Sequence, residues 1–508
     1  MTSAKRVTQK PVKSQVYLYL AFVVVTSFFT YFYRYNYPPY PFWDEPYHVA
    51  AAQKYLNGVF FMEPHPPLGK LLIALGEKVT QSNSPEKDAA FIRTDYATGL
   101  GDGYSFTGYR LFPALLAWLA APLFFLIFLH FTTNPALSAL LSFLYVFDNA
   151  QIVHSRGAMV DTPVTFFGLL LILVLLKLPK IPPSKNLRFI LASLLSGVVF
   201  GLIMTTKVVG LIFILLFPVT VWLLWTQWKR VSQFMIFATL GFIIAYVSIW
   251  QIHFSLSTKV LPELNESGYY QASDAYKDIL ARKATNDFRS FPIMLRDSFR
   301  YVSHYEQGVP RLDLCKPDEN GSPSWMWPIG ARSINYRWER AESGAIRYLY
   351  LQSNPVTWGC GLLGVILSII LLGSRVFVPS SPKLKHGFMM AVFLAVYTSY
   401  MIAISHLDRV MYLYHYFIPL TLSYILFGLS VENIVNIGPM TVDAGKRLLG
   451  MTVLSLFMFA GFQYFHALSY YEPLTTDAFN RLRLLPSWEL ACVGCVKFSP
   501  IAVSCNRQ

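Results

Sequence analysis

The sequence is short of charge. Only 14% of its 508 residues are Asp, Glu, Lys or Arg, whereas soluble domains carry about 25%. Hydrophobic residues make up 54% and aromatic residues 16%, a composition that also excludes an intrinsically disordered chain. The sequence therefore predicts a protein that crosses a membrane many times.

Cysteine is scarce as well. Five cysteines are too few for a disulfide scaffold, and no two CxxC motifs occur together as a zinc site would need. Three of the five, Cys492, Cys495 and Cys505, lie in a tail that we expect to face outward, where they could oxidise. Sequence spacing does not say which of them pair.

Long runs without charge supply the predicted spans. A spanning helix needs about 20 mostly apolar residues, and the sequence holds eleven such segments. They are 16–33, two within 111–147 that separate at Asn134-Pro135, 158–176, 189–206, 208–228, 231–250, 355–374, 387–405, 410–431 and 448–466. No cleavage site follows the first segment, so we interpret it as a retained helix and not a signal peptide. The predicted fold class is an all-α polytopic membrane protein.

The net charge is +14, and the positions of the positive residues predict the orientation in the membrane. Groups of Lys and Arg occur in the N-terminal tail and in alternate short loops, which places those segments in the cytoplasm. The predicted organisation is a cytoplasmic tail at 1–15, a transmembrane catalytic module at 16–250 with its outer loop at 34–110, a second outer loop at 251–354, transmembrane helices at 355–467, and an outer tail at 468–508.

The first outer loop carries two adjacent acids, Asp44 and Glu45, directly after an aromatic cluster. Pro46 suits the first turn of a helix, and apolar residues follow at helical spacing, which predicts a short helix at the membrane surface. Acids often occupy helix starts for structural reasons alone. A second unusual run follows, in which His65 and Lys70 flank Pro66-Pro67 and could meet an anion at the start of another helix.

Together these runs resemble the first luminal loop of the protein O-mannosyltransferase family, which has the GT-C fold. The matching stretches are Asp44-Glu45, the segment from Glu63 to Lys70 with its His-Pro-Pro-x-Gly-Lys pattern, Tyr109-Arg110, the Trp325-Met326-Trp327-Pro328 segment, and the segment from Arg409 to Tyr416 with its Leu-Tyr-His-Tyr pattern. Glu63 stands where the family usually has Asp. The second outer loop is too short for the MIR domain of eukaryotic members, so the chain is more similar to bacterial or archaeal ones.

The resemblance implies a donor, an acceptor and a reaction. The donor would be mannose on a dolichyl or other polyprenyl phosphate, and the acceptor a Ser or Thr hydroxyl of an exported protein. Transfer by single-step inversion needs a base for the hydroxyl and cationic stabilisation of the departing phosphate. We expect Asp44 to be the base and Glu45 to position the acceptor.

Candidate partners of the donor phosphate are the cations near the outer helix ends. They are Arg110, His65, Lys70, Lys207, Arg409 and His415. Residues expected to bind the acceptor or shape the site are Arg34, Glu63, Trp325 and Trp327. For Lys207 and Arg409 the alternative is snorkelling to the membrane interface, and for the two tryptophans it is interfacial anchoring. We expect Asp148 and Asp161 to be acids near a helix end that Arg156 satisfies.

Other readings stay open. No cofactor is predicted to be required; Asp44, Glu45, Glu63 and His65 could gather around a divalent cation, but no ligand motif supports one. The chain could instead transfer a sugar to a lipid or glycan, or be a non-catalytic transporter or scaffold. Ionisable residues gather at the outer helix ends and not at mid-membrane, which favours an enzyme over a transporter. The predicted site faces the extracytoplasmic side of a cell membrane, or the lumen of the endoplasmic reticulum.

Overall fold

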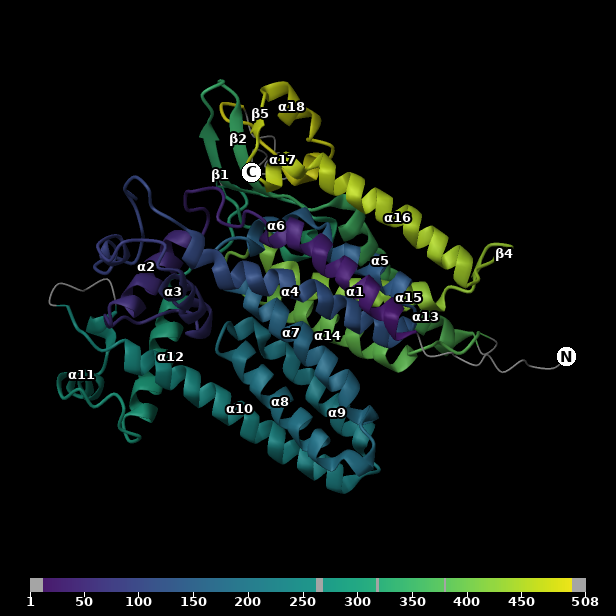
Figure 1. Cartoon of the computed structure of the whole chain (residues 1–508), viewed down its shortest axis with the longest axis horizontal. Helices are drawn as coiled ribbons and strands as arrows, with labels where there is room; N and C mark the ends of the chain where they lie inside the picture. The colour runs from purple at the N-terminus through teal and green to yellow at the C-terminus, as the bar shows by residue number, and fades with distance from the viewer. Residues whose placement is uncertain (1–11, 262–267, 317–318, 379–380, 496–508) are drawn as a thin grey trace.

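The protein is a bundle of long helices with most of its shorter elements gathered at one end (Figure 1). The computed structural model describes residues 12–261, 268–316, 319–378 and 381–495. Cys505 lies outside these described residues. The short helices α2 and α3 and the strands β1 and β2 lie at the end of the bundle away from the start of α1 (Figure 1).

Nine helices among the described residues are long and apolar enough to cross a membrane. They are formed by α1 (Lys13–Ser27) with η1 (Phe28–Phe32), α4 (Thr107–Thr132), α7 (Asp161–Lys177) with η3 (Leu178–Lys180), η4 (Pro183–Lys185) with α8 (Asn186–Met204), α10 (Trp228–Leu256), α13 (Pro355–Phe377), α14 (Gly387–Ser405), η8 (Leu413–Tyr416) with α15 (Phe417–Asn433), and α16 (Ala444–Tyr464). A tenth span is a broken one, because α5 (Pro135–Val146) and α6 (Asn149–Ser155) are bent by 64°.

The predicted eleventh segment is a shorter apolar stretch, Val208–Leu224. It begins as a 3₁₀ helix, η5 (Val208–Leu215), and continues as α9 (Leu216–Leu224). A 3₁₀ helix rises about 2.0 Å per residue, so this stretch still extends about 30 Å, roughly the thickness of the hydrocarbon core. The fold class is confirmed, and the count of eleven is reached only when this stretch and the broken span are included.

Sequence signals explain several helix ends. The predicted break at Asn134-Pro135 is confirmed, since α4 ends at Thr132 and α5 begins at Pro135. The Asn134 side chain accepts a hydrogen bond from the backbone N–H of Leu137, and proline is tolerated at the first helical position.

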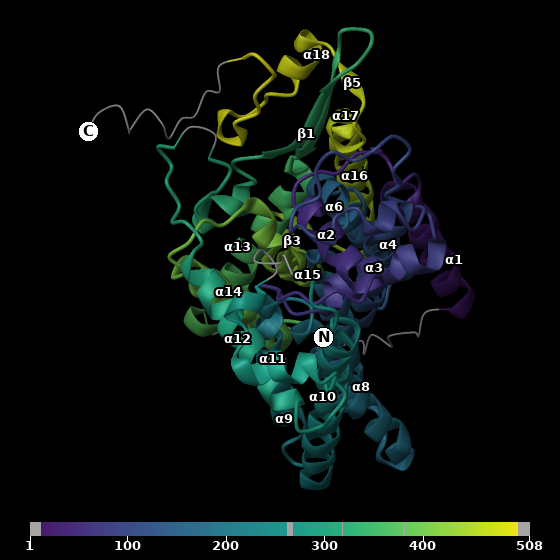
Figure 2. The ribbon, with the colours of Figure 1, turned by 90° about the vertical axis from the view of Figure 1, so that its left-hand side faces the viewer.

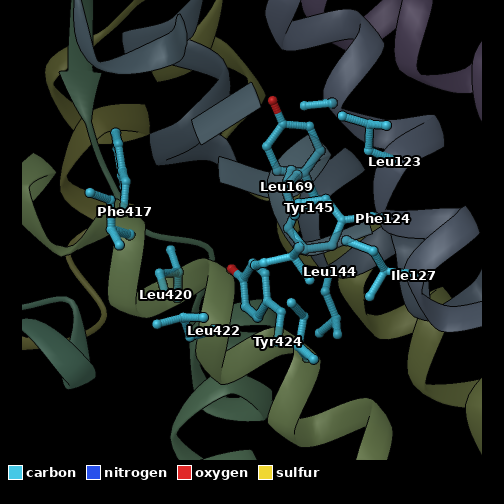
Figure 3. Close-up of a cluster of buried hydrophobic side chains, with 14 of the residues drawn as sticks. Leu123, Phe124, Ile127, Leu144, Tyr145, Leu169, Phe417, Leu420, Leu422 and Tyr424 are labelled. Atoms are coloured by element: carbon cyan, nitrogen blue, oxygen red, sulfur yellow. The ribbon is translucent and has the colours of Figure 1, made fainter. Parts of the chain in front are cut away.

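The core lies where α4, α5, α7 and α15 meet (Figure 3). Phe124 of α4 stacks on Tyr145 of α5, and Tyr424 of α15 packs against Phe124. Elsewhere small residues allow close approach, as at Gly197 of α8, where a Cβ would lie 1.8 Å from the carbonyl oxygen of Ala238 in α10.

Most of the remaining elements lie at one end of the bundle, and β4 (Met440–Thr441) lies at the opposite end (Figure 1). Helices α2 (Glu45–Leu56) and α3 (Leu68–Thr80) pack beside the start of α4 (Figure 2), and α11 (Asp274–Ala281) and α12 (Phe291–Gln307) belong to the second loop. The other short elements are η2 (Lys87–Ala89), η6 (Tyr269–Gln271), η7 (Ser324–Ile329), β3 (Asn436–Ile437), β4 (Met440–Thr441), α17 (His466–Ser469), α18 (Thr476–Arg481) and η9 (Pro486–Trp488).

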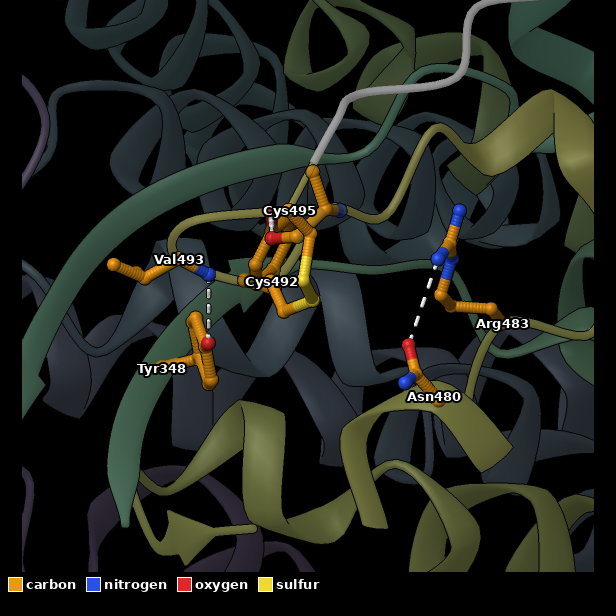
Figure 4. The surroundings of a disulfide bond; sticks show 8 residues. Tyr348, Asn480, Arg483, Cys492, Val493 and Cys495 are labelled. Atoms are coloured by element: carbon orange, nitrogen blue, oxygen red, sulfur yellow. Dashed lines mark hydrogen bonds between the residues drawn. A yellow bond between two sulfur atoms is a disulfide. The ribbon is translucent and has the colours of Figure 1, made fainter. Parts of the chain in front are cut away.

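A small antiparallel sheet joins the second loop to the C-terminal tail. Its order is β1 (Ile334–Arg340), β2 (Ile346–Leu351) and β5 (Pro473–Leu474), so β1 is an edge strand. Cys492 and Cys495 form a disulfide next to this sheet, and the backbone N–H of Val493 donates to the Tyr348 hydroxyl at 3.0 Å (Figure 4). Cys315 is also disulfide-bonded.

Candidate functional site

Asp44 and Glu45 mark the start of α2. The helix begins at Glu45 with Pro46 in its first turn, so the predicted helix is confirmed. Its residues Val49 to Ala52 are buried because α2 packs against α3. The helix is therefore a rigid interior element that holds Asp44 at its N-cap.

Glu45 is fully buried and fully bonded. Its Oε1 accepts from Arg110 Nε at 2.7 Å and from the Ala158 backbone N–H at 2.7 Å. Its Oε2 accepts from Arg110 Nη2 at 2.8 Å and from the Phe42 backbone N–H at 3.1 Å. A carboxylate with both oxygens occupied in this way has no capacity to receive a substrate. The expectation that Glu45 positions the acceptor finds no support in this geometry.

Arg110 is equally enclosed, with no exposed surface. Besides Glu45 it donates to the carbonyl oxygens of Asn36 (3.0 Å), Pro38 (2.6 Å) and Tyr40 (2.8 Å). These bonds use all five N–H groups that a guanidinium offers. The geometry therefore does not bring Arg110 to a donor phosphate as expected from the sequence; it fixes the backbone that leads into Asp44.

Asp44 has the opposite surroundings. It is half-buried, has no ion-pair partner among the residues described, and its Oδ2 accepts a long hydrogen bond from the Tyr414 hydroxyl at 3.5 Å. Burial raises the pKa of the Asp44 carboxyl, and the positive charge of nearby Lys207 works against that shift. Of the two adjacent acids, Asp44 is the one whose carboxylate is free for chemistry.

A chain of polar side chains lies next to Asp44. Lys207 Nζ donates to Asp161 Oδ1 at 2.7 Å, and Asp161 Oδ2 is 3.3 Å from His154 Nε2. The other ring nitrogen of His154 is 2.7 Å from the Tyr336 hydroxyl. Tyr414 connects this chain to Asp44, because its ring stacks on His154 with centroids 4.8 Å apart and lies 5.4 Å from Lys207 Nζ.

The sequence analysis misjudged Asp161 and missed His154 and Tyr336. The expectation that Arg156 satisfies Asp148 and Asp161 is wrong. Asp161 pairs with Lys207, and Asp148 accepts from Trp358 (3.1 Å) and Tyr424 (2.9 Å). His154 and Tyr336 received no role at all. A signal for Asp161 existed, since Pro163 follows it in the first turn of α7 as Pro46 follows Asp44.

The His-Pro-Pro segment lies close to Lys207. The backbone N–H of Leu68, the first residue of α3, donates to the Thr205 carbonyl at 2.7 Å, so that helix start is already occupied. Lys70 is buried in an ion pair with Glu63. Burial lowers the pKa of His65 well below its usual range, helped by the positive charges of Lys207 and Lys70. His65 is therefore a neutral group near two lysines.

His48 is a second neutral histidine in this region. Burial lowers its pKa to about 3, and its Nδ1 is 2.6 Å from the Ala158 carbonyl oxygen. Because a carbonyl can only accept, Nδ1 carries the proton. No motif in the sequence singled out this residue.

The late Arg409 to His415 segment is not helical at its beginning. The helix starts at Leu413, and Arg409 precedes it and pairs with Glu306 of α12. His415 is buried, and its Nδ1 lies 3.2 Å from the Tyr412 backbone nitrogen. It lines a small pocket together with Asp161 and Tyr414. The segment therefore brings His415 toward the polar chain and leaves Arg409 at the periphery.

The remaining predicted residues divide between the interior and the surface. Trp327 is fully buried and its indole N–H donates to Ser322 Oγ at 2.8 Å, whereas Trp325 is 72% exposed. Arg34 is exposed, its guanidinium lies over the Tyr37 ring, and it lines a cavity that does not include Asp44. Within the described ranges, no group of three or more His, Cys, Asp or Glu residues gathers in a way that could hold a metal ion.

A cavity of about 1030 Å³ opens beside the residue that precedes Asp44. Trp43 lines it and stacks on Tyr336, with ring centroids 4.9 Å apart. The edge strand β1 forms one wall through Asn335, Arg337 and Trp338. The cavity gives a wide approach to the Trp43 side of the site.

The chain is similar in sequence to proteins of one known family. Residues 21–259 match the family described as dolichyl-phosphate-mannose-protein mannosyltransferase, and residues 304–488 match the C-terminal four TMM region of protein-O-mannosyltransferase. The chain is 32% identical over 203 residues to protein O-mannosyl-transferase 2 of Danio rerio, which covers 39% of this chain and 25% of that protein. It is 33% identical over 154 residues to dolichyl-phosphate-mannose–protein mannosyltransferase 4 of Schizosaccharomyces pombe, covering 29% of this chain and 19% of that protein. The matches thus span about a fifth to a quarter of the length of these curated relatives.

Solved structures share the fold. The Saccharomyces cerevisiae protein O-mannosyltransferase Pmt1-Pmt2 complex bound to the sugar donor superimposes with a TM-score of 0.76 at 15% identity, over 99% of this chain and 96% of that one. The oligosaccharyltransferase of Archaeoglobus fulgidus gives a TM-score of 0.50 at 12% identity, over 92% of this chain and 57% of that one. At these identities the likeness establishes the architecture alone.

Proposed function

Since this chain belongs to the protein O-mannosyltransferase family, we propose that it transfers mannose from a dolichyl or other polyprenyl phosphate to Ser or Thr hydroxyls of proteins. The observation that carries the proposal is the contrast between two neighbouring acids. Both carboxylate oxygens of Glu45 bond to Arg110. The Asp44 carboxylate has no ion-pair partner among the described residues and lies next to Tyr414 and Lys207.

Asp44 is the proposed general base. The acceptor hydroxyl gives its proton to the Asp44 carboxylate while its oxygen forms a bond to C1 of the mannose. The bond between C1 and the phosphate oxygen breaks at the same time, and the polyprenyl phosphate leaves with the electron pair. Because that leaving group departs as an anion, no second acid is needed, and a single carboxylate suffices for inversion.

Lys207 is the proposed partner of the leaving phosphate. An ammonium group has three donors, and only one of those on Lys207 is used by Asp161. Its Nζ lies 5.4 Å from the centre of the Tyr414 ring, and the hydroxyl of the same tyrosine donates to Asp44. A fixed positive charge there would stabilise negative charge as it develops on the phosphate. His65 and His415 also lie near the Lys207 ammonium group, and Lys70 lies near His65.

We propose that Arg110 and Glu45 act indirectly, by positioning Asp44. Their buried pair holds the backbone from Asn36 to Phe42 against α4, and this backbone leads directly into Asp44. We assign the cavity beside Trp43 to the acceptor polypeptide, because it is wide, open and partly walled by an edge strand. The distribution of Lys and Arg supports an extracytoplasmic location for this end of the bundle.

A direct assay tests the proposal. Purified full-length protein is given radiolabelled mannose on a polyprenyl phosphate, with and without a Ser/Thr peptide. We expect label on the peptide, and no label on a matched peptide with Ala in place of Ser and Thr. Turnover of the donor onto a lipid or glycan without peptide labelling would assign the chain to a different acceptor class. Absence of any donor turnover by the folded protein would overturn the enzymatic proposal.

A further inference from the structure

A second cavity, of about 560 Å³, lies away from Asp44 between the first and last spans. Helices α1 and α16 both pack against α5, and the cavity lies between them, closed at one end by β2 and β5. Its lining includes none of the residues assigned above to the polar chain around Asp44. The two sites adjoin the same short helix, because α6 contributes His154 to the first and ends at Arg156, which lines the second.

Three arginines line this cavity: Arg34, Arg156 and Arg347. Arg156 is 4% exposed; its Nη2 donates to the Arg34 carbonyl oxygen at 2.6 Å, and its Nε has no partner although it is buried. Neither Arg34 nor Arg347 makes a side-chain ion pair with any residue that the structure describes. A buried guanidinium N–H without an acceptor is costly, and the Arg156 residue that carries it lines the cavity.

The cavity has almost no compensating negative charge. Its one lining carboxylate, Glu472, is 3.2 Å from Nδ1 of His466. Burial lowers the pKa of Arg156 to about 10, and the positive charges of Arg110 and Arg34 contribute to that shift. The site is therefore a concentration of positive charge.

Part of the lining is apolar and reaches the outer surface of the bundle. Val25, Phe29, Phe147, Phe459 and Phe462 line it. Val25 is 56% exposed and Phe29 58% exposed, on a helix long enough to cross the membrane. A free phosphate would be satisfied by the arginines alone and would have no use for these side chains. An anionic head with a hydrocarbon chain fits both parts of the cavity.

We propose that this cavity binds the headgroup of an anionic phospholipid, with its phosphate at Arg156 and Arg347 and a hydrocarbon chain between α1 and α16. This binding site is separate from the one at which the proposed reaction takes place. It does not depend on mannosyl transfer, and it is tested by binding alone.

Native mass spectrometry of the full chain in detergent tests it, with dioleoyl phosphatidylglycerol as the probe and dioleoyl phosphatidylcholine as the neutral comparison. We expect one phosphatidylglycerol per chain to be retained preferentially. Arg347→Gln should weaken that binding by about tenfold or more, since a charge-assisted hydrogen bond is lost. Arg34→Gln should act in the same direction. Arg340→Gln is the matched control, because Arg340 belongs to the same sheet, is exposed and does not line the cavity.

Additional measurements distinguish this lipid site from the other possible explanations of lipid retention. Lys207→Gln should leave phosphatidylglycerol binding unchanged, because Lys207 belongs to the other site. Equal retention of both lipids, equal loss in Arg340→Gln, or binding lost only in Lys207→Gln would overturn the proposal. So would inorganic phosphate displacing the lipid at equal concentration, or a second copy of the chain occupying the α1–α16 face without lipid. These substitutions are read in protein whose thermal unfolding matches the unmodified chain.

Discussion

Glu45 and Arg110 form a buried bidentate pair, with Nε to Oε1 at 2.7 Å and Nη2 to Oε2 at 2.8 Å. Both side chains have no exposed surface. The pair joins the start of α2 to the start of α4, which are 65 residues apart in the sequence. It also separates the roles of two adjacent acids, because Glu45 is committed to structure and Asp44 is left for chemistry.

Breaking this pair should therefore cost stability before it affects donor binding. Removing one partner of a buried ion pair leaves an uncompensated charge and typically costs about 3–5 kcal/mol. We expect Arg110→Gln to lower the unfolding temperature of the purified protein markedly, and Glu45→Gln to do the same. The double substitution should cost less than the sum of the two. A fully stable Arg110→Gln protein with a raised KM for the donor would return Arg110 to the phosphate role predicted from sequence.

Asp44→Asn should abolish transfer in a folded protein. The side chain keeps its size but can no longer accept the hydroxyl proton, and general-base catalysis is worth about 10²–10⁴ in rate. Initial rates of peptide mannosylation measure the loss. Asp274→Asn is the control, because Asp274 lies at the exposed start of α11. Near-normal rates in Asp44→Asn would remove Asp44 from the base role.

Lys207→Gln should raise the KM for the lipid donor and lower kcat, because the proposed phosphate partner is lost both before and during bond breaking. The ion pair between Lys207 and Asp161 leads to a second expectation. Asp161→Asn should weaken the same step by releasing the lysine from its position, and the two effects should not add. Additive effects on kcat/KM would show that Asp161 and Lys207 act independently.

The acid side of the pH profile should report Asp44. Only the ionised carboxylate is a base, and burial raises its pKa, so kcat/KM should begin to fall at a higher pH than the ordinary Asp value of about 3.9 would give. The midpoint of that limb, measured at subsaturating donor, checks the expectation. A midpoint at the ordinary value would mean that Asp44 is solvated in the working enzyme.

His48 should make the protein acid-sensitive. Its pKa is about 3 in the folded chain and about 6.5 when unfolded. The unfolded state therefore binds the proton first, and stability is lost progressively as pH falls from about 6.5 toward 3. We expect His48→Gln to flatten this part of the dependence of the unfolding temperature on pH. An unchanged slope in that variant would assign the acid sensitivity to other groups such as His65.

Gly197 should tolerate no larger side chain. A Cβ there would lie 1.8 Å from the Ala238 carbonyl oxygen, so Gly197→Val must push α8 and α10 apart. Overpacking of this kind costs about 1–3 kcal/mol, seen as a lower unfolding temperature in detergent. Gly373→Val is the matched control in another spanning helix, where a Cβ meets no atom within 4 Å. Equal stability of the two variants would contradict the close packing of α8 on α10.

The sequence predicted those structural features that depend on residues close together in the chain. Apolar runs predicted the spans, and Asn134-Pro135 predicted the break between α4 and α5. Pro46 predicted the start of α2. The stretch 208–228 was misjudged as one ordinary helix, because nothing in an apolar run distinguishes 3₁₀ from α geometry.

The sequence by itself determined a polytopic helical protein and the two acids from which the site is built. Only the tertiary structure decided which acid is free, since the answer depends on Arg110, a residue 65 positions later. The same holds for Asp161, which was assigned to nearby Arg156 and instead pairs with Lys207, 46 residues away. Charge partners buried in a membrane bundle are chosen by which helix ends meet, and the order of residues along the chain does not encode that directly.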